Sequence, residues 1–464
     1  MFFRQIVHSD LGCASYVVAS TESNEAAVVD PRWEIEPYLE LANDHGFRIT
    51  TIVETHNHAD HVSGHGRLTA ATGARILVHE DAGVEYDHDD LADGQIVVLG
   101  DVRLHVLHTP GHRPEHIALA VEDTSRGADP WLVLTGDSLL IGDVARPDLA
   151  VDGHTGAELL FESLHAKLLA LPEFTAVYPA HVAGSLCGRV SSEVSSSTIG
   201  YERRYNTALE VSDRDSFVTH MNERLPARPP NMERIVAENK GPLQSNVRDL
   251  PRLTPEAAAQ ELDNGAIALD VRPSPTYLAA HIAGSIHVPV SGSQFGTRAG
   301  FVIPPDSPLV IVAEGEDEAR LAAQSLRVVA YDTAAGYLVF GDWKRQDRTT
   351  TTIDTVDVLD VSRNWLNHHP IVDVREPDEW REGAILGSVN VPYRAIGAGL
   401  DGIASSEPVA VVCASGNRSA IAASLLERAG YAQVTNVEGG TDRWKAAGLP
   451  LEAGVGGRDL DRFR

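Results

Sequence analysis

The stretch VETHNHADHVSG, residues 53–64, places four metal-binding side chains within six positions. They are His56, His58, Asp60 and His61. The apolar run RITTIVETH (48–56) leads directly into the stretch and is typical of a buried strand. A side chain at the end of a strand is held rigidly by the sheet, so it can converge with others on one point. The stretch therefore predicts a metal centre at the edge of a sheet.

Three further strands are predicted within residues 102–112, 130–137 and 174–181, and each run ends on another ligand-type residue. These are His112, Asp137 and His181. A set of histidines and carboxylates suits two zinc ions, with Asp137 as the bridge and an activated water between them. It also suits one ferrous ion, held by two histidines and one carboxylate with positions left open. The ligand types alone leave both alternatives open.

The composition limits the class of protein. A chain of 464 residues is long enough for two to four domains. Its net charge of −28 argues against nucleic-acid and anionic-membrane partners, which require a basic surface. There is no apolar run of about 18 residues that would span a membrane, and the first residues lack the features of a signal peptide. Three widely separated cysteines favour a reducing compartment. We therefore expect a cytoplasmic protein.

The second half of the chain contains an internal repeat. Residues 268–290 align without gaps with residues 371–393, and residues 309–323 pair with residues 409–423. Each copy alternates strands and helices, which predicts a small α/β domain with a parallel sheet. The expected domains are residues 1–240, a linker at 241–252, and the two copies at 253–348 and 353–455.

The second copy carries a cysteine loop, VVCASGNRSAIAA (411–423). Cys413 follows a predicted buried strand, and the loop turns through Gly416 and Asn417 into a helix. Backbone N–H groups, the helix N-terminus and Arg418 all favour a nucleophilic thiolate. We expect Cys413 and Arg418 to be catalytic, and Gly416, Asn417 and Ser419 to bind the substrate. In the first copy Ala313 and Glu318 stand at the positions of Cys413 and Arg418, so that copy is expected to be inactive.

Residues 1–240 resemble the metallo-β-lactamase superfamily, whose fold is an αββα sandwich. Within it, glyoxalase II-type thiolester hydrolases hold two zinc ions, whereas persulfide dioxygenases hold one iron. The second resemblance implies one Fe(II) per chain, with Zn²⁺ as the alternative, on His56, His112 and Asp137. The remaining four residues would then orient ligands and water or serve a second metal. They are His58, Asp60, His61 and His181.

Two segments favour the dioxygenase. GDVARPDLA (142–150) resembles the Gly-Arg-x-Asp segment of that family, with alanine in place of glycine. It implies that Arg146 binds an anionic group of the thiol carrier, and a surface pair of Arg146 with Asp148 is the alternative. YPAHVAGSLCG (178–188) resembles the corresponding segment of the multidomain dioxygenases and makes Cys187 a candidate redox thiol. The alternative is that Cys187 is only a small buried side chain. Cys13, in LGCASYVV, is expected in the core.

Residues 353–455 resemble a whole rhodanese domain, and residues 253–348 resemble one without its cysteine. The six residues from Cys413 to Arg418 form a shorter loop than that of the related phosphatases, which suits a persulfide sulfur rather than phosphate.

The whole layout resembles the multidomain persulfide dioxygenase–sulfurtransferases of bacterial sulfide detoxification. That resemblance implies thiol persulfide and O2 as substrates, sulfite and thiosulfate as products, and a homo-oligomer. The rival hypotheses are a dizinc thiolester hydrolase fused to a rhodanese, and a non-enzymatic persulfide carrier or sensor with a structural metal.

Overall fold

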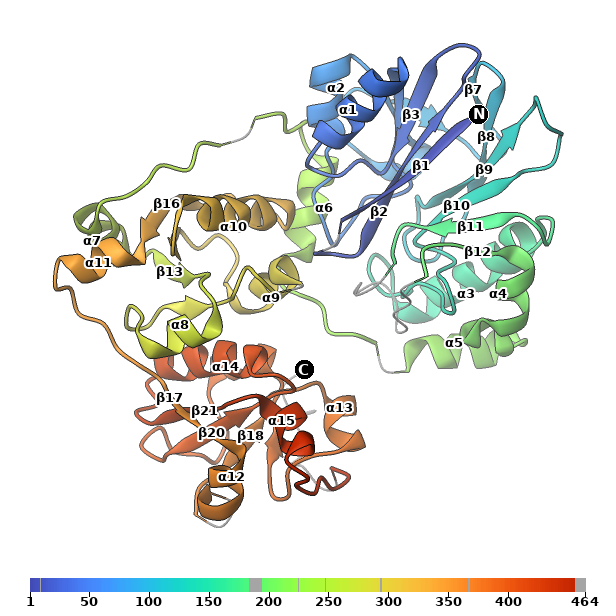
Figure 1. The fold of residues 1–464 in the computed structure, drawn as a ribbon. Helices are drawn as coiled ribbons and strands as arrows, with labels where there is room; N and C mark the ends of the chain where they lie inside the picture. The colour runs from blue at the N-terminus through green and yellow to red at the C-terminus, as the bar shows by residue number, and fades with distance from the viewer. Residues whose placement is uncertain are drawn as a thin grey trace. The chain divides into compact units, whose positions relative to one another are not determined.

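The structure is a computed structural model that describes residues 1–8, 10–182, 194–223, 225–246, 248–292, 294–365 and 368–454. The chain divides into two compact units (Figure 1). The first covers residues 1–247, and the second covers nearly all of residues 248–464. Within the described ranges, no helix combines the length and the apolar character needed to cross a bilayer.

The first unit contains two six-stranded mixed sheets. One sheet has the order β1-β2-β3-β4-β5-β6, in which β3 to β6 run parallel. Its strands are β1 (Phe2–His8), β2 (Cys13–Ala19), β3 (Glu25–Val29), β4 (Arg48–Val53), β5 (Arg75–His79) and β6 (Asp89–Leu91). The other has the order β12-β11-β10-β9-β8-β7, in which only β10 and β11 pair in parallel. Its strands are β7 (Ile96–Leu99), β8 (Val102–His108), β9 (Ile117–Asp123), β10 (Leu132–Gly136), β11 (Ala176–Pro179) and β12 (Ser197–Thr198).

The two sheets pack face to face around an apolar core. Along β2, Tyr16 and Val18 lie in this central core, whereas Val17 and Ala19 lie in a second core on the other face. Successive side chains of a strand point to opposite faces, so a strand covered on both faces is apolar throughout. This explains why β2, β9 and β10 are buried along their whole length.

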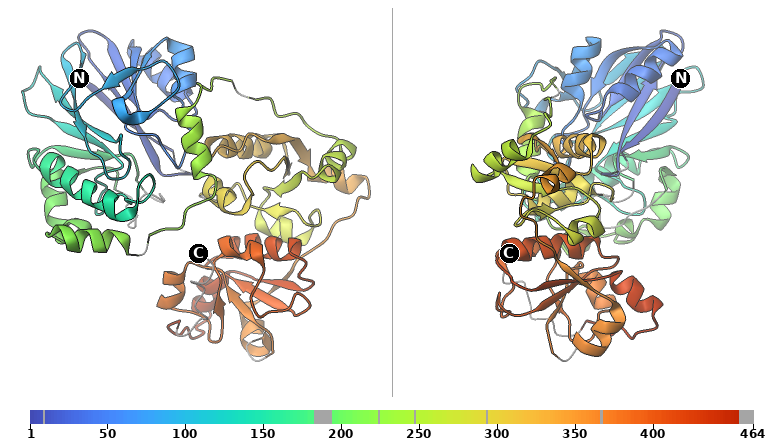
Figure 2. Two further views of the ribbon diagram at one scale, coloured as in Figure 1. Left: turned by 180° about the vertical axis from the view of Figure 1, so that it is seen from behind. Right: turned by 60° about the vertical axis from the view of Figure 1, so that its left-hand side comes forward.

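Helices cover the two outer faces. Tyr38 of α1 and Leu68 of α2 pack on the first sheet, whereas Leu160 of α3 and Phe217 of α5 pack on the second. Figures 1 and 2 show these layers. The predicted αββα sandwich is therefore confirmed. The helical segments are α1 (Glu36–His45), α2 (His65–Thr72), η1 (Glu80–Ala82), α3 (Gly153–Ser163), η2 (Leu164–Leu168), α4 (Ile199–Tyr205), η3 (Thr207–Glu210), α5 (Arg214–Asn222) and α6 (Met232–Lys240).

The second unit contains two parallel sheets, one for each copy of the repeat, as predicted. The first copy begins at α7, where the Thr254 hydroxyl accepts from the Ala257 N–H and Pro255 follows. Its elements are α7 (Pro255–Asp263), β13 (Ile267–Asp270), α8 (Ser274–Ala279), β14 (Ile286–His287), α9 (Phe295–Val302), β15 (Leu309–Ala313), α10 (Glu316–Val328), β16 (Ala334–Val339) and α11 (Phe340–Arg345).

The second copy follows the same order of strand and helix, with an additional edge strand. Its elements are β17 (Asp354–Val356), α12 (Val358–Asp360), η4 (Val361–Trp365), β18 (Ile371–Asp373), α13 (Pro377–Glu382), β19 (Val389–Asn390), η5 (Tyr393–Ala398), β20 (Val409–Val412), α14 (Asn417–Arg428), β21 (Val434–Val437) and α15 (Gly440–Ala446).

The same buried ion pair marks both copies. Arg272 pairs with Asp270 at 2.6 Å, and Arg375 pairs with Asp373 at 2.6 Å. Each arginine also donates to a backbone carbonyl eight residues later in its own copy. The pair thus ties the end of the first strand to the segment after the following helix, and removal of either partner would leave a buried charge.

Candidate functional site

Three of the predicted ligands come together at the edge of the sandwich. His56 follows β4, Asp137 directly follows β10, and His112 lies just beyond β8. Their ligand atoms lie within 4.8 Å of one another, and none of the three residues is more than 3% exposed. The Oδ2 atom of Asp137 lies 3.8 Å from Nε2 of His56 and 3.4 Å from Nε2 of His112.

Hydrogen bonds orient both rings. The Thr55 hydroxyl donates to Asp30 at 2.8 Å and therefore accepts from His56 Nδ1, 2.9 Å away. His112 Nδ1 donates to the Arg146 carbonyl at 3.0 Å. Because each Nδ1 carries the proton, each Nε2 presents a lone pair toward Asp137. A second hydrogen bond of this kind is the usual means of orienting a metal-binding histidine.

The converging atoms lack ordinary partners. Nε2 of His56, Nε2 of His112 and both carboxylate oxygens of Asp137 are buried and form no hydrogen bond within the described part of the chain. Burial by itself raises the pKa of Asp137, but His181 and His112 outweigh it and hold that pKa well below its usual range. Buried polar groups are almost always satisfied, and a metal ion would satisfy all four atoms. The three residues therefore fit a metal ion.

His58 makes different contacts from His56. Its Nε2 lies 3.2 Å from Asp30 Oδ1 and 3.3 Å from Glu54 Oε2. Burial alone would lower the pKa of His58, but the two carboxylates raise it well above its ordinary value. This geometry places His58 against two carboxylates and outside the His56, His112 and Asp137 group, although it also lies within metal-ligand spacing of Asp60 and His61.

Of the other three predicted residues, His181 contacts Asp137, and Asp60 lies between His181 and His61. His61 Nδ1 lies 3.1 Å from Asp60 Oδ1. His181 Nε2 lies 3.2 Å from Asp137 Oδ2 and 3.4 Å from Asp60 Oδ2. This side of Asp137 thus offers two histidines and a carboxylate, which is the chemistry that a second metal ion requires.

Cys13 is a buried core residue as predicted, and its thiol also contacts the site. Its thiol donates to Asp60 Oδ2 at 3.1 Å, and Cys13, Asp60 and His181 form a group with metal-ligand spacing. The contact arises because Cys13 forms an isolated β-bridge with His181. The sequence analysis missed it, since no local pattern links residues so distant in the chain.

The expected pair of Arg146 with Asp148 is present, but Arg146 is buried rather than on the surface. Arg146 is 3% exposed, and its Nε and Nη2 donate to Asp148 at 2.7 and 2.9 Å. Arg228 also pairs with Asp148. The Nη1 atom of Arg146 is buried and has no hydrogen-bond partner among the described residues. Cys187 lies outside the described residues.

A further histidine, His116, supports the site and was not predicted. Its Nε2 accepts from the backbone N–H of Asp137 at 2.8 Å, and its Nδ1 lies 2.8 Å from the Thr109 hydroxyl. Burial lowers the pKa of His116 to about 3, which keeps the ring neutral. Gly136 lies against this ring with φ +51°, and a Cβ there would approach His116 Nε2 to 2.5 Å. The HRPEH spacing (112–116) was the available signal.

The cysteine loop is built as a cradle in the second unit. Cys413 follows β20 and is 1% exposed. Its sulfur accepts from the Gly416 N–H at 3.1 Å and lies 3.4 Å from the Ser419 hydroxyl. Gly416 has φ +102°, a left-handed conformation that glycine adopts without strain. The loop thus directs the Gly416 N–H toward the sulfur, while the Ser419 hydroxyl donates to the Gly416 carbonyl at 3.0 Å.

Arg418 is engaged in an ion pair. Its Nη1 and Nη2 donate to the two carboxylate oxygens of Glu379 in α13 at 2.6 and 2.8 Å. Burial by itself raises the pKa of Glu379, but Arg418 outweighs it and lowers the pKa overall. An anion that binds Arg418 must therefore share or displace this carboxylate, which the sequence analysis did not predict.

In the first copy, the Glu318 side chain bonds to the backbone of the equivalent loop. Glu318, at the position of Arg418, accepts from the backbone N–H of Glu314 at 2.7 Å. Burial, with Glu314 and Asp270 nearby, raises the pKa of Glu318. Ala313 takes the place of the cysteine at the end of β15. An acidic loop without a nucleophile has no means of carrying sulfane sulfur.

Comparison with known proteins places this geometry in a family. The model described as "Metallo-beta-lactamase superfamily" matches residues 8–181, and the model described as "Rhodanese-like domain" matches residues 254–343 and 356–447. The human protein "Persulfide dioxygenase ETHE1, mitochondrial" is 30% identical over 227 residues, covering 48% of this chain and 82% of that relative. The chain belongs to the metallo-beta-lactamase superfamily. It adds two rhodanese-like domains to the metallo-beta-lactamase domain.

The relatives carry more than one activity. A "Hydroxyacylglutathione hydrolase" from Cereibacter sphaeroides is also 30% identical, over 224 residues that cover 46% of this chain and 81% of the relative. The crystal structure of a metallo-beta-lactamase from Staphylococcus aureus subsp. aureus COL is 27% identical with a TM-score of 0.65, and the match covers 73% of this chain and 98% of that one. These similarities establish the fold and leave the activity open between two chemistries.

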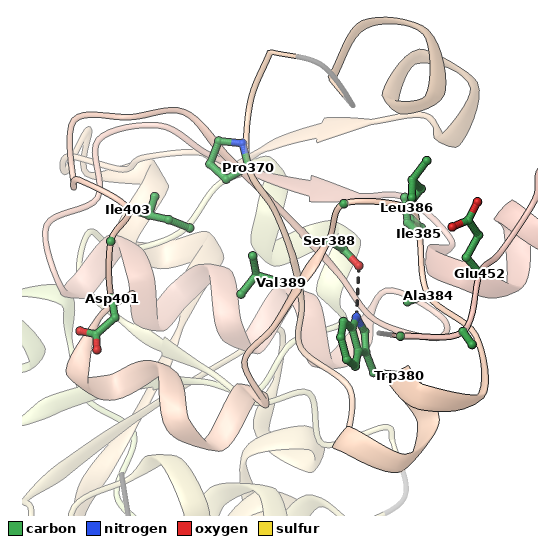
Figure 3. A pocket seen from close by; sticks show the side chains of 14 residues that line it. Pro370, Trp380, Ala384, Ile385, Leu386, Ser388, Val389, Asp401, Ile403 and Glu452 are labelled. Carbon is green, nitrogen blue, oxygen red and sulfur yellow. Dashed lines mark hydrogen bonds between the residues drawn. The ribbon is translucent and has the colours of Figure 1, made fainter. Parts of the chain in front are cut away.

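The rhodanese-like domain with Cys413 also contains a cavity of about 450 Å³. Trp380 of α13 lies on one side and donates from its indole N–H to the Ser388 hydroxyl at 3.2 Å, while Asp401 and Ile403 lie on the other side (Figure 3). Its described lining does not include the 413–418 loop, so this cavity is separate from the sulfur cradle.

Proposed function

We propose that the chain is a non-haem iron persulfide dioxygenase coupled to a rhodanese sulfurtransferase that forms thiosulfate, within sulfide and persulfide detoxification in the cytoplasm. The observation that carries the proposal is the separation of His56, His112 and Asp137 from His58. Two histidines and one carboxylate converge within metal-ligand spacing, and His58 is not part of that group. Its Nε2 lies 3.2 Å from Asp30 and 3.3 Å from Glu54 instead. This is the ligand set of one ferrous ion with open positions rather than of a four-ligand zinc site.

The overall reaction of the first site consumes one O2 and one water for each persulfide. R–S–SH, O2 and water give R–SH and sulfurous acid, so the outer sulfur loses four electrons and O2 gains them. A ferrous ion on His56, His112 and Asp137 would provide adjacent positions for the persulfide sulfur and O2. The buried Nη1 of Arg146 supplies a charged donor for an anionic group of the thiol carrier. His181 and Asp60 lie beside Asp137, where they hold the water that releases sulfite.

The second site transfers sulfur without net oxidation. The Cys413 thiolate attacks the outer sulfur of a persulfide, the S–S bond to the carrier breaks, and the carrier thiolate leaves. Sulfite then attacks the sulfur held on Cys413, and thiosulfate and the Cys413 thiolate are formed. The Gly416 N–H stabilises negative charge on Cys413, and Arg418 attracts the anionic partner.

A zinc-dependent thiolester hydrolase with a fused rhodanese is the second candidate. Its support comes from Asp60, which lies within metal-ligand spacing of both His61 and His181, the side-chain types that a second metal ion would use. Its support also comes from the hydroxyacylglutathione hydrolases, which match this chain as well as the persulfide dioxygenases do.

The deciding experiment combines metal analysis with O2 consumption. The full chain, purified under nitrogen, is expected to hold one iron and to consume O2 with glutathione persulfide or coenzyme A persulfide. Two zinc ions, no O2 uptake and hydrolysis of lactoylglutathione would overturn the proposal in favour of the hydrolase. Sulfur loading on Cys413 without turnover at the metal would identify a carrier instead.

The substitution Glu379→Gln tests the role of Arg418. It removes the charge that competes for Arg418, so the KM for sulfite in thiosulfate formation is expected to fall by about threefold, as for loss of a partly exposed ion pair. The rate of Cys413 loading by persulfide should not change. The measurement is steady-state thiosulfate production across sulfite concentrations, and an unchanged or higher KM for sulfite would contradict the expectation. Arg381→Gln, in the same helix but paired with Asp378, is the matched control.

A further inference from the structure

The first rhodanese-like domain contacts the helix that follows the cysteine loop. Within the second unit, α8 and β14 of the first copy lie along α14 of the second (Figures 1 and 2). The contacts occur near both ends and in the middle of α14. At the start, Ser274 Oγ lies 3.2 Å from Asn417 Oδ1; in the middle, the His287 N–H donates to the Ser424 hydroxyl at 3.0 Å. Near the end, Glu427 lies 3.0 Å from His281 Nε2.

Ser274 is a rigid contact point. It is 6% exposed, and its hydroxyl also lies 3.1 Å from His287 Nε2. His287 is fully buried, donates from Nδ1 to the Asp270 carbonyl at 3.1 Å and stacks on Tyr277 with ring centroids 4.2 Å apart. Both neighbours are acceptors, so the hydroxyl donates its one proton either to His287 Nε2 or to Asn417 Oδ1. Asn417, by contrast, has an exposed side chain, so Ser274 is its anchor.

Asn417 adjoins the group that contacts the catalytic sulfur. The preceding residue, Gly416, donates its N–H to Cys413 Sγ at 3.1 Å and adopts φ +102°. Glycine at this angle is conformationally free, so the direction of its N–H depends on what holds the neighbouring residues. We propose that Ser274, in the copy without a cysteine, is a positioning residue that holds Asn417 and thereby keeps the Gly416 N–H directed at Cys413.

This proposal gives the inactive copy a defined task in the sulfur-transfer site. The same domain also contacts η5 of the second copy, where Phe301 of α9 meets Tyr393 with ring centroids 6.3 Å apart. The inference rests on the proposed function only in taking Cys413 as the nucleophile. It explains why a domain without a cysteine retains a buried Ser274–His287 pair facing its partner copy.

Ser274→Ala in the full chain is the test, read by the pH profile of iodoacetamide alkylation at Cys413. Mass spectrometry of the Cys413 peptide separates this thiol from the other two cysteines. Loss of one neutral hydrogen bond is expected to slow alkylation near neutral pH by about threefold to tenfold and to shift the profile to higher pH. Glu427→Ala is the matched control, because it breaks a contact of the same interface at the far end of α14.

A purely structural role predicts a different result. In that case both variants lower the unfolding temperature and neither moves the alkylation profile, which would overturn the proposal. A double-mutant cycle with Asn417→Ala adds a second criterion. If Ser274 acts through Asn417, the two effects on alkylation are non-additive, whereas full additivity would contradict this route. Alkylation of Cys413 requires no persulfide turnover, so this experiment can be interpreted even if the proposed sulfur transfer does not occur. Thiosulfate assays detect a failure of sulfur transfer separately.

Discussion

His112→Ala is expected to abolish O2 uptake with a thiol persulfide and to strip most of the iron from the protein. His112 supplies one of the three converging ligand atoms, and its orientation is set by the Arg146 carbonyl. Loss of a residue that only supports a ligand typically costs about 10- to 100-fold, so loss of the ligand should exceed about 100-fold. The measurements are iron content after anaerobic purification and O2 consumption with glutathione persulfide.

His61→Gln is the matched control for this prediction. His61 contacts Asp60 rather than the His56, His112 and Asp137 group, and its side chain is almost as buried as that of His112. With a single iron site, the variant keeps its iron and most of its O2 uptake. With a two-metal site, it loses the second metal and its activity falls as severely as that of His112→Ala. Equal losses in the two variants would therefore contradict the mononuclear proposal.

Cys413→Ser is expected to abolish thiosulfate formation while leaving O2 uptake and sulfite production intact. A serine hydroxyl accepts the Gly416 hydrogen bond, but it cannot carry sulfane sulfur, so the loop geometry is retained and only the nucleophile is removed. Removal of a catalytic nucleophile lowers the rate by more than about a thousandfold. The measurements are sulfite and thiosulfate yields from the same persulfide reaction, together with O2 consumption.

The amount of sulfite that the Cys413→Ser variant forms shows whether the metal site works independently of Cys413. Because Cys413 and His112 belong to separate compact units, we expect sulfite to accumulate in the Cys413→Ser variant at the rate at which the normal protein forms it. Loss of O2 uptake in this variant would show that the iron site needs the cysteine and would contradict the proposed division of labour. The mass of the Cys413 peptide, with or without one added sulfur atom, verifies that loading has stopped.

Much of the fold was predictable from local sequence patterns. The apolar runs before His56, His112 and Asp137 are strands, so each ligand could be placed at a strand end in advance. The three meet only because the sheet that contains β4 packs on the sheet that contains β8 and β10. The repeat was equally visible, because it preserves Asp270 and Arg272 in one copy and Asp373 and Arg375 in the other. The glycine turn after Cys413 likewise predicted, from local sequence alone, a strand, a loop and a helix around the thiol.

The partners of these residues were not predictable, because they arise from contacts between segments far apart in the chain. His58 faces Asp30 only because β3 and β4 pair in parallel register, and Cys13 lies beside His181 only because the two residues form a β-bridge. Arg418 meets Glu379, and Asn417 meets Ser274, through packing between elements that share no sequence pattern. Strand period and turn chemistry act over a few residues and place the reactive groups. Sheet register and domain packing act over the whole chain, and they select which of those groups remain available for a metal or a sulfur atom.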